Sequence, residues 1–150
     1  GDFQYCVRFA REFPGCARVL DQSHYYLGTI YQKKGQAGLA VQHYEAAISV
    51  NPKYVPPRLR LAQMLSRGGD REAALSHLEK AIEANPRSAT AHAAMARLLV
   101  DQKKYDEAWK HAREAEKNGG DVKELLASLR RVSKEPAAEP QSAPLESSAK

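Results

Sequence analysis

The fold of this chain can be read from residues 21–54, DQSHYYLGTIYQKKGQAGLAVQHYEAAISVNPKY, because their pattern returns at a fixed spacing. Asn51-Pro52 recurs as Asn85-Pro86, 34 residues later. Small residues recur at the same interval: Ala40 as Ala74 and Ala108, and Ala47 as Ala81 and Ala115. Such a period marks an array of helix pairs, each of which buries its apolar face by stacking on its neighbours. We therefore divide the central chain into units 21–54, 55–88 and 89–122.

Each unit predicts two helices joined by a short turn. In the first unit, residues at the three- and four-residue spacing of one helical face are His24, Leu27, Gly28 and Tyr31. Gly35 follows, where the C-terminus of a helix favours a left-handed residue. A second amphipathic stretch then ends at Asn51-Pro52. The other two units repeat this order.

Small residues occupy matching positions in both helices of every unit. They are Gly28, Ala62 and Ala96 in the first helices, and Ala40, Ala74 and Ala108 in the second helices. Side chains this small let two antiparallel helix axes approach to about 8–10 Å. We therefore expect each pair of helices to cross at these residues.

With these residues in view, the chain resembles the tetratricopeptide repeat family, whose unit is 34 residues long. The first unit matches the family pattern at Leu27-Gly28, Tyr31, Ala40, Tyr44, Ala47 and Pro52, with His24 in place of the opening aromatic residue. The third unit departs from the pattern, since Ala112 replaces an aromatic residue and Gly120 replaces the closing proline. The resemblance implies an all-α fold, a right-handed α-solenoid of stacked antiparallel helix pairs.

Further segments flank the three repeats 21–122. Residues 1–20 predict a helix over 2–13 and a linker, and this helix is either part of a preceding repeat or an unrelated cap. Residues 123–131 predict a C-terminal capping helix that begins near residue 121, where Asp121 and Glu124 have capping-box spacing. Residues 132–150 are rich in Pro, Ala, Glu and Ser, which predicts a disordered tail.

Composition excludes several classes of protein. Charged residues make up 27% of the chain and apolar residues 43%, with no apolar run long enough for a membrane span and no signal-like stretch. The net charge of +5 favours acidic partners but falls short of a nucleic-acid-binding cluster.

A cytoplasmic location is slightly favoured, although the chain begins with Gly1, as a processed or excised fragment would. Cys6 and Cys16 match no zinc pattern and are either free thiols or a disulfide.

Catalytic and metal-binding patterns are missing from the sequence. His43, His77 and His111 recur with the repeat, but stacked helices lie about 8–10 Å apart and Zn–N bonds are about 2.0–2.1 Å long. We interpret the recurrence as duplication of one semi-exposed position and expect no metal. No nucleophile–base grouping and no glycine-rich loop after a strand is present. We therefore expect no enzyme activity and no cofactor.

A candidate peptide-binding groove follows from the first helices of the three units. Their outward faces carry Tyr25, Tyr26, Thr29, Lys33, Leu59, Arg60, Gln63, Arg67 and Arg97. In proteins similar to this one, that face lines a concave surface that binds peptides. Tyr and Arg are enriched at binding hot spots. A merely solvated basic face is the other interpretation, and Arg60 and Arg97 are expected to be solvated in either case.

Two functional hypotheses remain open. The first is a non-catalytic module that binds an acidic protein or peptide segment with an apolar anchor. The second is a structural element that self-associates through its terminal helices. Family members that clamp the C-terminal carboxylate of heat-shock chaperones use Lys, Asn and Arg at positions that here hold Tyr25, Thr29, Arg60, Thr90 and Ala94. Only Arg60 is basic, so we expect that clamp to be absent.

Overall fold

The structure is a computed structural model that describes residues 19–134 and 136. The helix predicted over 2–13 lies outside the described residues, as does most of the tail predicted over 132–150. Seven α-helices make up the described part, and no strand occurs there: α3 Leu20–Lys33, α4 Ala37–Val50, α5 Val55–Arg67, α6 Arg71–Ala84, α7 Ala89–Asp101, α8 Tyr105–Lys117 and α9 Lys123–Val132.

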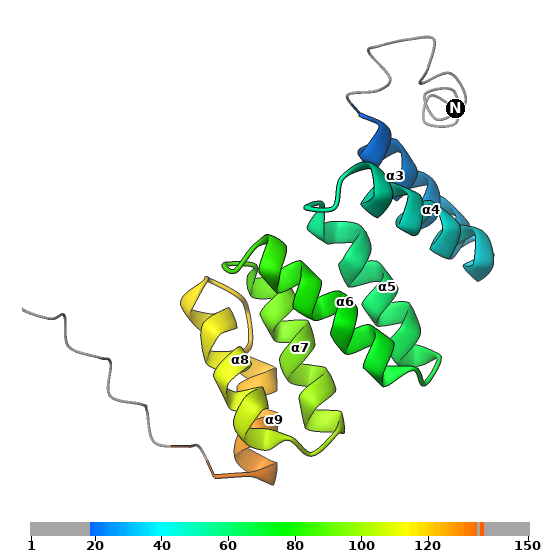
Figure 1. Ribbon diagram of the computed structural model, residues 1–150. Helices are drawn as coiled ribbons and strands as arrows, with labels where there is room; N and C mark the ends of the chain where they lie inside the picture. The colour runs from blue at the N-terminus through cyan, green and yellow to red at the C-terminus, as the bar shows by residue number, and fades with distance from the viewer. Residues whose placement is uncertain (1–18, 135, 137–150) are drawn as a thin grey trace, which may run out of the picture.

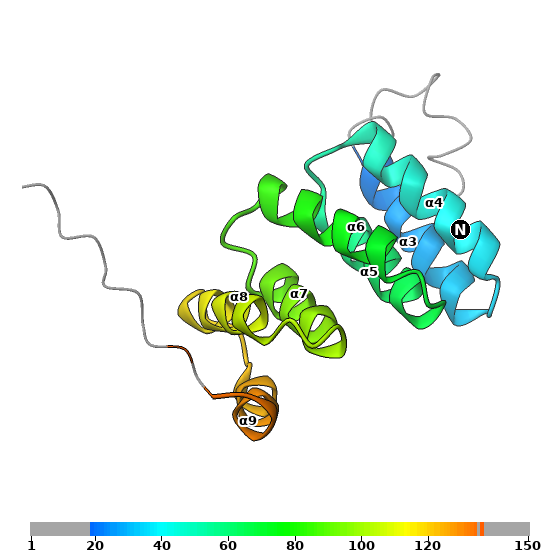
Figure 2. The ribbon, with the colours of Figure 1, turned by 60° about the horizontal axis from the view of Figure 1, so that its bottom comes forward.

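The helices stack as antiparallel pairs, which confirms the predicted solenoid. Figure 1 shows α3 with α4, α5 with α6, and α7 with α8 side by side, and α9 closing the array beyond α8. The turned view in Figure 2 shows the pairs following one another and α9 lying across the last pair. The helices α3, α5 and α7 therefore open the three pairs, and α4, α6 and α8 complete them.

The recurring Asn-Pro connections have a local cause. Asn51 Oδ1 accepts a hydrogen bond from the backbone N–H of Lys53 at 3.2 Å, and its backbone oxygen accepts one from Tyr54 N–H at 3.0 Å. Asn85 repeats both contacts: its Oδ1 accepts from Arg87 N–H at 3.1 Å, and its backbone oxygen accepts from Ser88 N–H at 3.0 Å. An asparagine side chain that bonds its own backbone two residues later makes a tight turn. The same turn therefore joins α4 to α5 and α6 to α7.

The first helix of each pair ends in the same left-handed turn. Gly35, Gly69 and Lys103 have φ angles of 75°, 91° and 61°. The backbone N–H after each of them donates to a carbonyl five residues back, as when Gln36 donates to Tyr31 at 2.9 Å. This pattern is a common C-terminal cap. The glycine predicted at this position is present in the first two pairs, whereas a lysine adopts the same conformation in the third.

The predicted close helix crossings are confirmed. A Cβ atom added to Gly28 would lie 2.7 Å from ring carbons of Tyr44 and 3.2 Å from the backbone oxygen of Ala40. Real Cβ atoms essentially never make contacts shorter than 3.0 Å, so α3 approaches α4 as closely as a glycine permits. The corresponding alanines of α6 and α8, Ala74 and Ala108, are fully buried.

The core of the described residues consists of two clusters of unequal size. The smaller cluster is formed by Ala40, Tyr44 and Leu61. The larger cluster runs from α5 to α9 and includes Trp109, the largest fully buried side chain. Trp109 Nε1 donates to Ser133 Oγ at 2.9 Å, which ties α8 to the end of α9. The last three helices therefore share one continuous core.

The start of α9 differs from the prediction. The predicted capping box at Asp121 and Glu124 is wrong, because Val122 is the N-cap residue and no side chain caps the helix. Val122 is only 3% exposed and belongs to the large core cluster. Burying this valine sets the direction in which the chain enters α9, and Asp121 is left exposed. Leu125, Leu126 and Leu129 are buried and form the packed face of the helix, and Val132 is 51% exposed.

Candidate functional site

A cavity of about 640 Å³ lies along α5 and α7, the first helices of the second and third pairs. Its walls include residues spaced by about one helical turn, which places them on one face of each helix. Those from α5 include Leu59, Gln63 and Arg67, and those from α7 include Ala93, Arg97 and Asp101. Tyr25 of α3 lies at one end of the cavity, and Gly120 and Asp121 lie beyond α8.

Six of the nine residues predicted for the groove line this cavity: Tyr25, Leu59, Arg60, Gln63, Arg67 and Arg97. The other three, Tyr26, Thr29 and Lys33, are on α3 and do not line it. Thr29 Oγ1 instead donates to the backbone oxygen of Tyr25 at 3.1 Å and accepts from Tyr44 OH at 3.3 Å. The hollowed part of the surface is therefore centred on the second and third pairs rather than spread over all three.

Charge is distributed unevenly along the cavity. Its lining contains three cations, Arg60, Arg67 and Arg97, and two carboxylates, Asp101 and Asp121. Arg67 and Arg97 are exposed, whereas Arg60 is partly buried. A hydrogen bond from Arg60 to the side chain of Tyr25 raises the pKa of Arg60, and burial opposes this rise. Arg60 is therefore less solvated than expected, whereas Arg67 and Arg97 are exposed.

Tyrosines gather where the cavity meets the first helix pair. The ring centroid of Tyr25 is 5.4 Å from Tyr26, 5.9 Å from Tyr44 and 5.7 Å from Tyr54. Burial raises the pKa of Tyr54 to about 12, and the nearby phenols and Asp21 contribute to the shift. Aromatic pairs at these separations are favourable contacts. Tyr54 is therefore a neutral hydroxyl at physiological pH.

The far end of the cavity was not predicted from the sequence. A Cβ atom at Gly120 would lie 2.9 Å from the backbone oxygen of Ala115 and 3.1 Å from the Cβ atom of Ala89. The glycine therefore lets the connection between α8 and α9 pass close to the start of α7, which brings Asp121 to the cavity. The only signal in the sequence is the replacement of the repeat's closing proline by Gly120.

Paired histidines within the helix pairs were also missed. His24 Nδ1 lies 3.0 Å from His43 Nδ1, and His92 Nδ1 lies 2.9 Å from His111 Nδ1. The ring centroids are 5.3 Å and 5.2 Å apart, so the two nitrogens of each contact lie between the ring centres, as in an N–H···N hydrogen bond. Within residues 19–134 and 136, no three potential metal ligands gather at one point.

Burial lowers the pKa of four of the five histidine side chains. They are His24, His43, His77 and His111. The histidine at the partner position lowers the pKa of His24 and His111 further, and Arg58 does the same for His77. The neutral rings are therefore the favoured state inside the helix pairs.

No helix in the described part of the chain is long and apolar enough to cross a membrane.

Solved structures share this fold at low sequence identity. The first TPR of Spaghetti (RPAP3), bound to the HSP90 peptide SRMEEVD, is 19% identical, with a TM-score of 0.68 over 75% of this chain and 89% of that one. The N-terminal domain of stress-induced protein-1 (STI-1) from C. elegans is 18% identical, with a TM-score of 0.68 over 79% and 98%. MamA is 21% identical, with a TM-score of 0.61 over 72% and 61%.

No curated protein matches the chain. Two family models do match, both described as tetratricopeptide repeat, one over residues 21–54 and the other over residues 65–131. Together they account for about two thirds of the sequence. The matched ranges contain α3, α4, α6, α7, α8 and most of α9, with α5 largely between them, and the chain belongs to the tetratricopeptide repeat family.

Proposed function

We propose that this chain is a protein-interaction module that binds an acidic peptide segment with an apolar anchor in the cavity along α5 and α7. The observation that supports this proposal is the arrangement of Arg60, Arg67 and Arg97 around one cavity that also has apolar walls. Guanidinium groups form strong, often bidentate hydrogen bonds with carboxylates. Leu59, Ala93 and Tyr25 would contact the anchor. No catalytic role is proposed for any described residue.

The geometry of the array suggests how the ligand would lie. Neighbouring helices are separated by about 8–10 Å, which is close to three residues of extended chain at about 3.3 Å each. Arg67 and Arg97 belong to α5 and α7, the first helices of successive pairs. A ligand with acidic side chains about three residues apart would therefore suit this strip.

The solved relatives support peptide binding in general rather than one particular ligand. The TPR of Spaghetti is bound to an HSP90 peptide, so a stack of this kind can hold a short segment. In this chain, the positions that the family uses to clamp a chaperone carboxylate carry Tyr25, Thr29, Arg60, Thr90 and Ala94. Of these, only Arg60 is basic, and it is hydrogen-bonded to Tyr25. We therefore expect an internal acidic segment rather than a chaperone C-terminus.

Charge reversal at the two exposed arginines tests this proposal. We expect Arg67→Glu with Arg97→Glu to weaken binding of acidic peptides from a fluorescent library by at least tenfold, measured by anisotropy. The matched control is Lys33→Glu with Lys34→Glu, which makes the same charge change at exposed residues outside the cavity. The control should bind nearly as well as wild type. Equal loss in both variants, or no loss in the first, would contradict the proposal.

A second candidate function is self-association through α3. Ile30 of α3 is 40% exposed, whereas the equivalent Leu98 of α7 is only 7% exposed and Met64 of α5 packs against the Ala40–Tyr44–Leu61 cluster. The preceding helix pair covers this position in α5 and α7. Ile30→Lys should reduce self-association in a sedimentation velocity concentration series. Leu39→Lys is the control, because Leu39 is 41% exposed on α4. A monomeric wild type would exclude this function.

A further inference from the structure

A second cavity, of about 330 Å³, lies between α6 and α8, the second helices of neighbouring pairs, and α7 also contributes to its lining. It shares no lining residue with the concave cavity. Its apolar lining comes from α6 and α7 and consists of Leu75, Ile82, Met95 and Leu99. We call this feature the α6–α8 groove. It lies outside the surface to which the proposed peptide-binding function refers.

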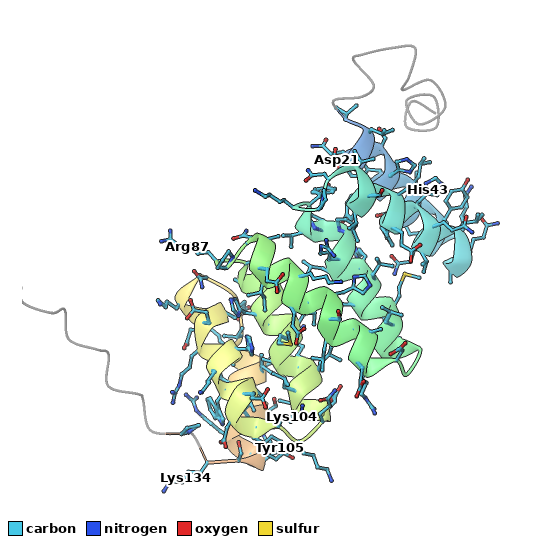
Figure 3. All side chains as sticks on the ribbon, in the orientation of Figure 1. Asp21, His43, Arg87, Lys104, Tyr105 and Lys134 are labelled. Atoms are coloured by element: carbon cyan, nitrogen blue, oxygen red, sulfur yellow. The ribbon has the colours of Figure 1, made fainter. Side chains whose placement is uncertain are left out.

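Carboxylates line both sides of the α6–α8 groove. Glu79 and Glu83 are one helical turn apart on α6, so they project from the same side of that helix. Glu107 lines the groove from α8, and the lining also includes one cation, Lys104, which directly precedes α8 and is labelled in Figure 3. All three glutamates are exposed, and none of them forms an ion pair with any residue among 19–134 and 136. The groove therefore has an excess of negative charge.

His111 also lines the groove, but its ring adds no positive charge. The carbonyl oxygen of Pro86 lies 3.0 Å from His92 Nε2 and can only accept, so His92 Nε2 carries the proton. With the proton on Nε2, His92 Nδ1 accepts a hydrogen bond from the N–H at His111 Nδ1, 2.9 Å away. Burial and the neighbouring His92 lower the pKa of His111, while Glu107 and Glu114 act in the opposite direction. The ring is therefore neutral near pH 7.

We propose that the α6–α8 groove binds a basic amphipathic segment of a partner protein. A Lys or Arg head group would lie between Glu107 and the two α6 glutamates, and its methylene stem would cover the apolar lining. Long basic side chains characteristically bury their stems on apolar surface and keep their charge among polar groups. A volume of about 330 Å³ is within the range of ligand-binding clefts. The molecule thus offers two cavities of opposite charge, which select partners of opposite chemistry.

Residues at the equivalent positions of the preceding repeats indicate which substitutions would remove the carboxylates of the groove with little effect on the helices. The positions of Glu83 and Glu107 correspond, 34 residues earlier, to Ser49 and Ala73. Both residues are accommodated at those positions in α4 and α6. The variant Glu83→Ser with Glu107→Ala therefore changes the groove without introducing residues foreign to the helices. Glu79→Gln with Glu83→Gln is a second variant that preserves side-chain shape.

The test uses the full chain and a panel of helical peptides with Lys or Arg beside Leu, measured by anisotropy. We expect both groove variants to bind at least tenfold more weakly than wild type and to keep the wild-type circular dichroism spectrum. The control, Glu72→Ser with Glu116→Ala, removes two exposed carboxylates outside the groove and should change affinity less than twofold. Arg67→Glu with Arg97→Glu should not weaken binding, which separates this inference from the concave-cavity proposal. An equal loss in the control, unchanged binding in the groove variants, or no binding by wild type would overturn the inference.

Discussion

Lys103 illustrates how a single residue departs from its repeat. Its φ angle of 61° lies in the left-handed region, where Gly35 and Gly69 hold the equivalent positions of the first two pairs. A side chain in this conformation costs about 1–2 kcal/mol relative to the right-handed region. Glycine adopts the left-handed conformation freely. It also loses more chain entropy on folding, which cancels roughly 0.5–1 kcal/mol of its advantage over lysine at this position. The third pair therefore contains a strain that the first two avoid.

We expect Lys103→Gly to stabilise the protein by up to about 1 kcal/mol, because it removes this strain. The reverse comparison is Gly69→Ala. A Cβ atom at Gly69 would have nothing within 4 Å, so its cost would come from the backbone alone. Urea denaturation of both variants should show opposite shifts in midpoint. A destabilised Lys103→Gly would mean that the lysine side chain makes a contact worth more than the strain.

At the scale of the element, each helix crossing is fitted to its own pair of side chains. Gly28 lies against Tyr44 in the first pair, and the equivalent positions hold Ala62 and Leu78 in the second and Ala96 and Ala112 in the third. All of these residues are buried. A smaller residue on one helix thus accompanies a larger one on its partner where the first pair crosses. The family pattern determines which positions meet at a helix crossing, and the side chains of each pair determine how large the residues at those positions are.

Gly28→Ala should destabilise the protein by about 1–3 kcal/mol, because the new methyl group would overlap the ring of Tyr44 at 2.7 Å. Adding Tyr44→Leu reproduces the combination of the second pair and should recover part of the loss. The recovery should be incomplete, because Tyr44 OH also donates to Gln32 Oε1 at 2.7 Å. A double-mutant cycle by chemical denaturation measures the coupling. Additive effects would show that the two side chains do not compete for space.

Four partly buried histidines make stability depend on pH. The pKa values of His24, His43, His77 and His111 are lowered below the 6.5 of an unfolded chain. As pH falls below 6.5, histidines of the unfolded chain therefore bind protons before those of the folded chain do, and the free energy of unfolding decreases. We expect a lower melting temperature at pH 5.5 than at pH 7.5. His111→Gln should show a smaller difference, because one such group is gone. A variant with the full wild-type difference would refute the assignment to His111.

The sequence alone predicted the helices and the small-residue crossings well, because both depend on spacing along the chain. The period placed Ala40, Ala74 and Ala108 at the crossings, and all three are fully buried. The contact between His92 and His111 could not be predicted in this way, because it depends on how two helices are rotated against each other. The N-cap of α9 was mispredicted because burial of Val122 outweighed a local capping pattern.

The candidate groove was predicted only in part for a related reason. The repeat pattern identified one face of α3, α5 and α7 as equivalent, and six of its nine predicted residues line the cavity. The pattern treats all three helices alike, whereas the cavity is hollowed along α5 and α7 and closed by the connection at Gly120 and Asp121. Departures from the repeat therefore shape the site as much as the repeat itself.

At the scale of the whole molecule, the two core clusters imply unequal local stability. Stability in repeat proteins is roughly the sum of each unit's own stability and the interfaces with its neighbours. The α7 and α8 helices share a continuous cluster with α9, in which Trp109, Leu125, Leu126 and Leu129 are buried. Among the described residues, the cluster centred on α4 has three buried members. The end of the array at α3 should therefore open more readily than the end at α9.

Native-state hydrogen exchange should reveal this gradient. Amides in α3 and α4 are expected to exchange faster than those in α7 and α8, since local opening at the first pair exposes less buried apolar surface. Leu129→Ala should then cost about 2–5 kcal/mol, because it leaves a cavity at a fully buried site. Its effect on exchange should be largest in α7, α8 and α9 and weakest in α3. Val132→Ala, at a residue that is 51% exposed in the same helix, should change exchange little. Uniform protection across the helices, or a uniform response to Leu129→Ala, would show instead that the array unfolds as a single cooperative unit.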